Sequence, residues 1–198
     1  MRPWLPLLLL GLVPSAQPAI LVDRAWSPTR GGETFPSQFT AFPGGWQLLP
    51  IGADDFTLRQ NADLHEVVLF GSLVPQAYHS PFLVTLATEP CGAPAFVGIA
   101  QPSRQAVGVD STGAVVHRLR IRFPFVVPLS AGRRYWLSAG PLIAPPTRPA
   151  FGWSSLKRVI GQPALSCVGG DRLPLNGQLP GGRRDLAFVV VGEPSSEF

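Results

Sequence analysis

Three arginines alternate with apolar residues near the middle of the sequence, at Arg118, Arg120 and Arg122. In a β-strand, residues advance about 3.3 Å each and alternate between faces, so these side chains would stand roughly 7 Å apart on one face. Guanidinium groups bind sulfate, carboxylate and phosphate groups through charge-assisted hydrogen bonds. The pattern indicates a binding surface for a polyanion. The alternative is an ordinary solvated face, whose charges also protect a sheet edge from aggregation.

Tryptophan offers a second binding chemistry, because an exposed indole ring presents a broad apolar surface on which a sugar ring can stack. Trp46 lies in a Pro- and Gly-rich region and Trp153 in a short aromatic segment beside loops. We expect these two to contribute to ligand binding, with packing in the core as the alternative for Trp153. Core packing is the expected role of Trp136, which lies within a predicted strand.

Carboxylates form a third group. Asp54 and Asp55 begin a predicted strand, and Asp185 is a possible neighbour across the sheet. Carboxylate oxygens are the hard ligands that Ca²⁺ prefers. An Asp pair at the start of a strand more commonly caps a turn. We therefore expect no resident metal or other cofactor, and these three residues are the weak candidates for a calcium site.

Motifs of known enzyme classes are present only in part. Residues 65–69 begin like the HExxH motif of zinc proteases but have Leu69 where the second histidine is needed. Ser154 and Lys157 match the SxxK motif of penicillin-binding serine enzymes, but Lys157 is the one lysine of the chain, so the companion KTG motif cannot exist. We assign no catalytic residue and expect a protein that is not an enzyme.

The N-terminus has the three parts of a secretory signal peptide: Arg2, an apolar run over residues 5–13, and small residues up to residue 19. The apolar run is about half as long as a membrane-spanning helix, and no later stretch is long enough to span a bilayer. We expect the leader to be cleaved and the mature chain, without a transmembrane segment, to be secreted into the periplasm or the extracellular space.

Two cysteines, Cys91 and Cys167, follow the leader. An even number of cysteines in an exported protein favours a disulfide, and a pair of buried free thiols is the alternative. A metal site built on two cysteines without a CxxC motif is improbable.

The composition is that of a folded domain, since 45% of the 198 residues are hydrophobic and 14% are charged. This balance excludes a disordered polyelectrolyte. The formal net charge is +4, and the basic residues are scattered rather than gathered in one tract or helix. Nucleic-acid binders usually concentrate them, so we expect no nucleic-acid partner.

The elements that must position these residues are short and have a period of two. The sequence predicts eight or nine strands with turn residues between them and no amphipathic helix, which is typical of an all-β protein with a single antiparallel β-sandwich or jelly roll. The strand-like stretches are 55–59, 64–73, 82–87, 95–100, 105–109, 115–127, 134–139 and 185–191, and an early strand near 46–49 would be the ninth; 151–154 is a short aromatic segment. Within 115–127 the odd-numbered residues should face the core and the arginines the solvent.

The chain therefore divides into four parts: a signal peptide (1–19), an irregular Pro- and Gly-rich segment (20–46), the β-sandwich domain (47–192) and a polar tail (193–198).

Six short motifs resemble those of secreted bacterial β-sandwich ectodomains, in the same order. They are ADDFTL (53–58), VVLFG (67–71), VPLSAG (127–132), YWLS (135–138), FGW (151–153) and DLAF (185–188). Such ectodomains are common among surface proteins of the PEP-CTERM sorting class, which are mostly of unknown function. The resemblance implies the fold and is nearly silent on activity. The sorting tail of that class is absent here, so its anchoring is not implied.

Together these observations lead us to expect a secreted, non-enzymatic β-sandwich protein that binds or decorates an extracellular surface. Carbohydrate is the first ligand class, and the expected partner is an extracellular glycan or an envelope protein. The alternatives are a structural cell-envelope component that acts through protein contacts and, less favoured, a hydrolase. An exposed Trp153 beside a groove would favour sugar binding, and burial of all three tryptophans would favour the structural role.

Overall fold

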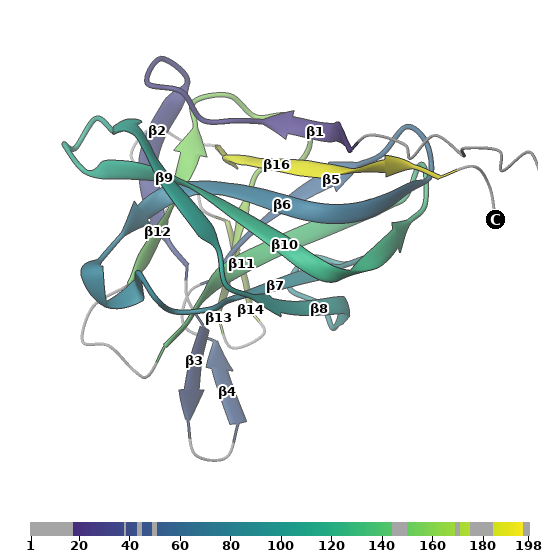
Figure 1. Ribbon diagram of the computed structural model, residues 1–198, viewed down its shortest axis with the longest axis horizontal. Coiled ribbons are helices and arrows are strands. Elements are labelled where there is room, and N and C mark those ends of the chain that lie inside the picture. The colour runs from purple at the N-terminus through teal and green to yellow at the C-terminus, as the bar shows by residue number, and fades with distance from the viewer. Residues whose placement is uncertain are drawn as a thin grey trace, which may run out of the picture.

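A computed structural model describes residues 18–37, 39–42, 45–48, 51–143, 150–168, 171–174 and 184–195 of the 198-residue chain. Within these ranges the regular structure consists of β-strands and one short 3-10 turn, η1 (Pro75–Ala77), and no helix is long and apolar enough to cross a membrane. The strands form two sheets that enclose a common apolar core (Figure 1). The predicted all-β sandwich is confirmed.

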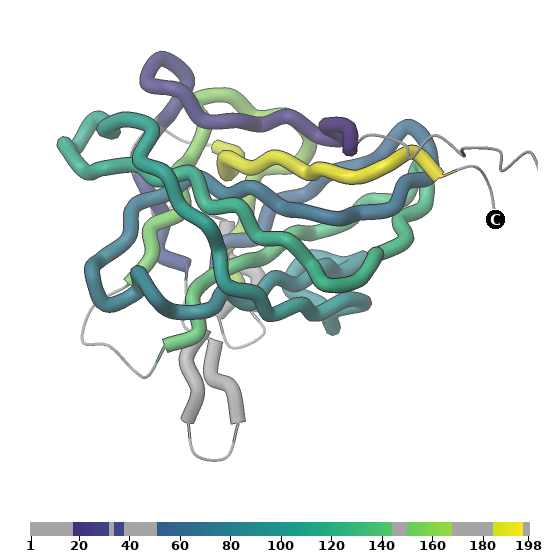
Figure 2. Tube along the Cα trace, viewed as in Figure 1, coloured from purple at the N-terminus to yellow at the C-terminus, as the bar shows by residue number. Residues whose placement is uncertain are grey.

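The first sheet, called sheet A, has the strand order β1-β16-β6-β10-β9, and β12 extends it by pairing with β6, β2 and β15. Its strands are β1 (Ala19–Arg24), β2 (Gly31–Pro36), β6 (Ala62–Leu73), β9 (Ser103–Val109), β10 (Val115–Leu129), β12 (Phe151–Leu156), β15 (Asp185–Leu186) and β16 (Phe188–Pro194). All of its pairs are antiparallel. The first and last of these strands, β1 and β16, lie side by side (Figure 2).

The second sheet, sheet B, has the order β14-β13-β5-β11-β3-β4, with β7 beside β11 and β8 beside β7. Its strands are β3 (Phe39–Phe42), β4 (Gly45–Leu48), β5 (Ile51–Thr57), β7 (Phe82–Ala87), β8 (Pro94–Ala100), β11 (Arg134–Ile143), β13 (Leu165–Val168) and β14 (Asp171–Pro174). The pair β3–β11 is parallel and the other pairs are antiparallel.

Strand β10 shows how the alternating sequence builds the core. Leu119 and Ile121 are fully buried between the sheets, and the arginines between them point to the outer side of sheet A. The alternation fails after Arg122, where the register between β10 and β6 shifts. Phe125, which the period places in the core, is therefore 50% exposed. The prediction for this residue was wrong because residues 123–126 lie in the irregular stretch between the two parts of β10 that pair with β6, and the alternation returns to the core at Val127 and Leu129.

The segment predicted to be irregular, 20–46, instead contributes strands to both sheets. β1 pairs with β16 and β2 pairs with β12, so the sandwich begins well before residue 47. At the other end, the first residues of the predicted tail, Glu193 and Pro194, complete β16. Both boundaries depend on pairing between the two ends of the chain, which the local composition does not reveal.

Cys91 and Cys167 form a disulfide bond, as predicted, with a separation of 76 residues in the sequence. The bond joins the turn after β7 to β13, and it packs with Ala53, Ala87 and Trp136 in a small apolar cluster. It therefore links two segments on opposite sides of the central strands of sheet B.

Candidate functional site

Arg118, Arg120 and Arg122 lie together with Glu66 on the outer side of sheet A; we call this group the arginine face. The register explains why they meet. Arg122 is paired directly with Glu66 across β10 and β6, and Arg118 is paired with Gln105 across β10 and β9. Directly paired residues in a sheet point to the same side. The predicted ladder of arginines is therefore present, with one acidic residue opposite its last member, Arg122.

Glu66 organises two of the three guanidinium groups. Arg120 donates from Nε to Oε1 at 2.8 Å and from Nη2 to Oε2 at 3.1 Å, and Arg122 donates from Nε to Oε2 at 2.8 Å. Arg118 instead donates from Nη2 to Oε1 of Gln105 at 2.6 Å. The Glu66 side chain is 5% exposed, whereas those of Arg120 and Arg122 are 44% and 73% exposed. A buried carboxylate thus holds two cations at the surface.

The electrostatics of Glu66 agree with this geometry. Burial raises its pKa, but hydrogen bonds and charge from Arg120 and Arg122 outweigh burial, so the pKa lies below its ordinary value. Glu66 is therefore ionised at neutral pH and neutralises one positive charge. Three guanidinium groups against one carboxylate leave the arginine face positive.

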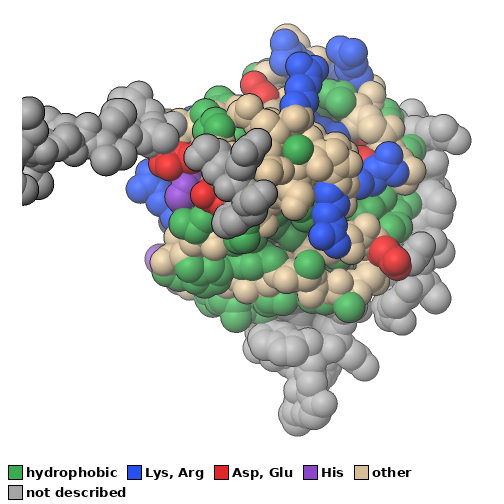
Figure 3. Space-filling model, turned by 90° about the vertical axis from the view of Figure 1, so that its right-hand side faces the viewer, with side chains coloured by type: hydrophobic (Ala, Val, Ile, Leu, Met, Phe, Trp, Pro, Cys, Tyr) green, Lys and Arg blue, Asp and Glu red, His purple; other side chains and the backbone are tan. Residues whose placement is uncertain are grey.

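A hollow of about 650 Å³ lies beside these side chains. Its walls include Arg120, Arg122, Phe123, Glu66, His65 and Glu193. His65 Nε2 and Glu193 Oε1 stand 3.9 Å apart at its rim. Figure 3 shows basic, acidic and histidine side chains close together at the left of the molecule, and further basic side chains in separate groups elsewhere on this side. The arginine face is thus a local basic group beside a hollow, within a surface of mixed charge.

The tryptophans do not form the expected sugar-binding surface. Trp153 lies on β12, not in a loop, and is fully buried; its Nε1 donates to the carbonyl of Ala187 at 2.8 Å, and its ring packs against Phe188. Trp136 is 2% exposed. The side chain of Trp46 lies outside the described part of the structure. The proposal of Trp153 as a stacking residue is corrected, because its side chain lies in the apolar core between the two sheets.

The three candidate calcium ligands come together around Arg24, a residue of β1. Arg24 Nη1 lies 3.0 Å from Asp54 Oδ1 and 3.3 Å from Asp185 Oδ2. Arg134 Nε lies 3.2 Å from Asp55 Oδ2. Among the described residues no group of three or more His, Cys, Asp or Glu side chains could hold a metal ion. The three aspartates are neighbours, as predicted, but the cation between them is the guanidinium group of Arg24 and not the calcium ion that the sequence suggested.

We call Arg24, Asp54, Asp55 and Asp185 the Arg24 cluster, and the side chains of all four are almost completely buried. Burial is the largest influence on Asp54 and raises its pKa well above the ordinary value; Arg24 opposes the rise and Asp185 adds to it. Burial likewise raises the pKa of Asp185 to about 6, against the opposing hydrogen bond from the Ile160 N–H and the charge of Arg24. The cluster therefore contains carboxyl groups that titrate far above their usual range.

A glycine is required beside the cluster. Gly161 has φ +103°, and a Cβ at this position would lie 2.7 Å from Asp55 Oδ1. The neighbouring Gln162 N–H donates to that same oxygen at 3.0 Å. The turn after β12 thus wraps closely around the carboxylates because residue 161 has no side chain.

The partial SxxK motif is not assembled into a catalytic pair. Ser154 is fully buried on β12 and its Oγ has no hydrogen-bond partner among the described residues, whereas Lys157 is exposed. His117 is buried on the inner side of β10, and its ring meets the edge of Tyr78 at 5.8 Å between centroids. Burial and the charge of Arg104 lower the pKa of His117. The burial of Ser154 and of His117 therefore indicates a role in packing and not in a catalytic pair.

Two residues that organise these groups were not singled out from the sequence: Glu66 and Arg24. Glu66 is the one glutamate within the apolar stretch 64–73. A carboxylate inside a buried strand signals a cationic partner, because an unpaired buried charge is costly. That signal could have found it. Arg24 sits in a segment rich in Pro and Gly, and no comparable local signal marks it.

Comparison with models of protein families and with curated protein sequences found no match to this chain.

Proposed function

We propose that the protein is a secreted, non-enzymatic β-sandwich that binds an acidic polysaccharide of an extracellular surface through the arginine face. The observation that carries the proposal is the Glu66 carboxylate, which holds Arg120 and Arg122 side by side at the surface through three hydrogen bonds.

The fixed geometry favours binding for an entropic reason. A free arginine loses rotamer freedom when it grips a ligand, whereas an arginine already held by a buried partner loses less. Each guanidinium group has five N–H donors. Glu66 uses two from Arg120 and one from Arg122, so further donors remain for a ligand on side chains that are 44% and 73% exposed.

The spacing favours a repeating ligand. The three arginines occupy every second position of β10, and residues two apart on a strand are separated by roughly 7 Å. Successive anionic groups of a polymer can bind along such a row, each through charge-assisted hydrogen bonds. Because Trp153 and Trp136 are buried, stacking on a neutral sugar has no support from either ring. The ligand class is therefore an acidic glycan rather than a neutral one.

Two features support export. The N-terminal sequence has the pattern of a signal peptide. The Cys91–Cys167 disulfide is a bond that persists mainly in oxidising compartments. An extracellular location would bring the arginine face into contact with surface polysaccharides.

The test is a binding titration with polygalacturonate, dextran sulfate and neutral dextran. The variant carries Arg118→Gln and Arg122→Gln. It keeps Arg120, because the buried Glu66 carboxylate would destabilise the protein without a cationic partner. The matched control carries Arg30→Gln and Arg158→Gln, two exposed arginines outside the arginine face. Both variants lose the same charge.

We expect the wild-type protein and the control to bind an acidic polymer and not neutral dextran, with affinity falling as salt rises. The arginine-face variant should lose at least tenfold in affinity at low salt, since charge-assisted hydrogen bonds contribute about 1.5–3 kcal/mol each. Equal losses in the two variants would mean that binding depends only on net charge and would refute the proposal.

One observation favours the structural alternative, a cell-envelope component held by protein contacts. Strand β8 is the last strand on its side of sheet B, and Val97 and Ile99 on it are 48% and 53% exposed. Exposed apolar residues on an edge strand favour pairing with another chain. If no glycan binds, a pull-down of envelope proteins that Ile99→Lys abolishes would support this alternative.

A further inference from the structure

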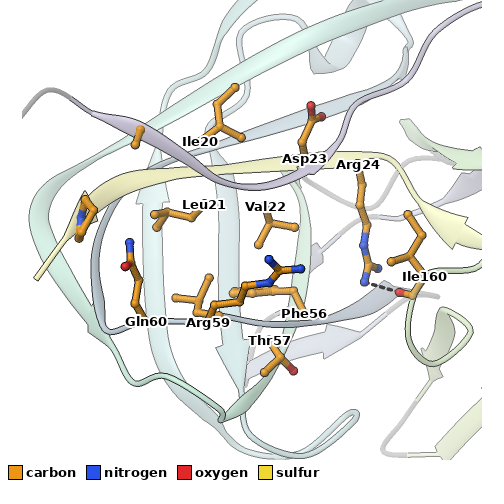
Figure 4. A pocket seen from close by; sticks show the side chains of 13 residues that line it. Ile20, Leu21, Val22, Asp23, Arg24, Phe56, Thr57, Arg59, Gln60 and Ile160 are labelled. Carbon is orange, nitrogen blue, oxygen red and sulfur yellow. Dashed lines mark hydrogen bonds between the residues drawn. The ribbon is translucent and has the colours of Figure 1, made fainter.

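A cavity of about 530 Å³ opens between the two sheets, at the edge formed by β1 of sheet A and β5 of sheet B (Figure 4). Phe56 and Leu58 on its wall belong to the core between the sheets. The arginine face lies on the outer side of sheet A, so the two sites are separate. The volume falls in the range of cavities that take one small molecule.

A bulge in β1 shapes this cavity. The register between β1 and β16 shifts between Ile20 and Val22. In a regular strand consecutive side chains point to opposite faces, but here Leu21 and Val22 both point toward the cavity, whereas Ile20 and Asp23 point away (Figure 4). The bulge thus places two adjacent apolar side chains opposite Phe56.

The charge that faces the cavity is positive. Arg24 is occupied by the carboxylates of its cluster, and Arg59 reaches into the space between the two strands (Figure 4). Among the described residues no ion pair engages the exposed Arg59. Asp23 is the acidic residue in the lining, and its side chain points away. The lining combines apolar side chains such as Leu21 and Val22 with polar ones, among them the guanidinium group of Arg59, and this combination complements a molecule with an alkyl chain and an anionic head.

We propose that this cavity binds one small anionic amphiphile, a medium-chain carboxylate, with its alkyl chain between Leu21, Val22 and Phe56 and its carboxylate on Arg59. The binding combines two terms that experiments separate. Each buried methylene group contributes through the hydrophobic effect, and the carboxylate contributes through charge-assisted hydrogen bonds to a guanidinium group.

The test is calorimetric titration of the full protein with octanoate, decanoate and 1-octanol, each below the concentration at which it forms aggregates. Decanoate should bind roughly 15-fold more tightly than octanoate, because each buried methylene tightens binding about fourfold. Arg59→Gln should weaken octanoate binding about tenfold and leave 1-octanol binding unchanged. Arg30→Gln removes the same charge outside the cavity and should leave both unchanged.

A second variant tests the position of the alkyl chain. Val22→Phe fills the space opposite Phe56 and should weaken octanoate and 1-octanol alike, with an unchanged circular dichroism spectrum. Arg59 is exposed, so its replacement leaves the core intact and the test stands even if Val22→Phe does not fold. Absence of decanoate binding at millimolar concentration, or equal effects of Arg59→Gln and Arg30→Gln, would overturn the proposal. Either result would leave the proposed binding of polysaccharide at the arginine face unaffected, because the two sites are separate.

Discussion

Replacing Asp185 by asparagine should remove a specific part of the pH dependence of stability. Asp185 is fully buried, and burial raises its pKa from 3.8 to about 6 in the folded state. Folding therefore disfavours the ionised form. The stability linked to this group is fully present below its ordinary pKa and is lost as the pH rises through about 6.

The magnitude follows from the size of the shift. A rise of about two pKa units corresponds to about 3 kcal/mol between the two protonation states. Integrated over pH, the wild-type protein should gain about 1 kcal/mol of stability from Asp185 when the pH falls from 7 to 5. The asparagine side chain cannot ionise, so the Asp185→Asn variant should not show this gain. Its amide oxygen can still accept the hydrogen bond that the Ile160 N–H donates to Asp185.

The assay is urea unfolding of both proteins at pH 7, 6 and 5, with the disulfide intact. The quantity of interest is the difference in unfolding free energy between variant and wild type at each pH. This difference cancels the titration of groups outside the cluster, such as His117, whose lowered pKa makes stability fall as the pH falls. It should shift by about 1 kcal/mol in favour of the wild type from pH 7 to pH 5.

The control is Asp23→Asn, on the same strand as Arg24 but pointing away from the cavity. Its difference from the wild type should not vary over this range. If the Asp185→Asn difference is also constant between pH 7 and 5, the reasoning about burial in the Arg24 cluster is refuted.

Three further outcomes follow from the structure. Glu66→Gln removes the carboxylate that holds Arg120 and Arg122 and should weaken binding of an acidic polymer several-fold, although the arginine face becomes more positive; stronger binding would mean that net charge, and not the positioning of the arginines, determines the affinity. Replacing Cys91 and Cys167 by serine should cost about 4 kcal/mol in urea unfolding, because the bond closes a loop of 76 residues, and a loss below about 1 kcal/mol would contradict this. Trp153→Phe should lower stability by about 1–3 kcal/mol through the loss of the hydrogen bond to Ala187, measured by thermal unfolding, while polysaccharide binding stays unchanged.

The sequence predicts most strands and the row of arginines in the arginine face, because both depend on local alternation of polar and apolar residues. The period of two in β10 places Arg120 and Arg122 on the opposite side from Leu119 and Ile121, as the structure has them. Asp54 and Asp185 are neighbours, as predicted, but they meet from β5 and β15 of the two different sheets and not across one sheet. The signal peptide and the resemblance to bacterial surface ectodomains remain predictions.

What the sequence does not predict depends on pairing between distant segments. Glu66 meets Arg120 across 54 residues, and Arg24 meets Asp185 from the other end of the chain. The short segment around Trp153 suggests a loop, but pairing with β2, β6 and β15 makes it a strand of sheet A, and its Trp153 side chain points into the core between the sheets. Such burial is set by the topology of the sheet and not by the composition of the strand.

The most direct test of the central claim is the affinity of dextran sulfate and polygalacturonate for the Arg118→Gln/Arg122→Gln variant, measured over a series of salt concentrations. The account predicts at least tenfold weaker binding at low salt and a shallower salt dependence than in the wild type or the Arg30→Gln/Arg158→Gln control. Identical affinity and identical salt dependence in the three proteins would show that the arginine face is only a solvated surface.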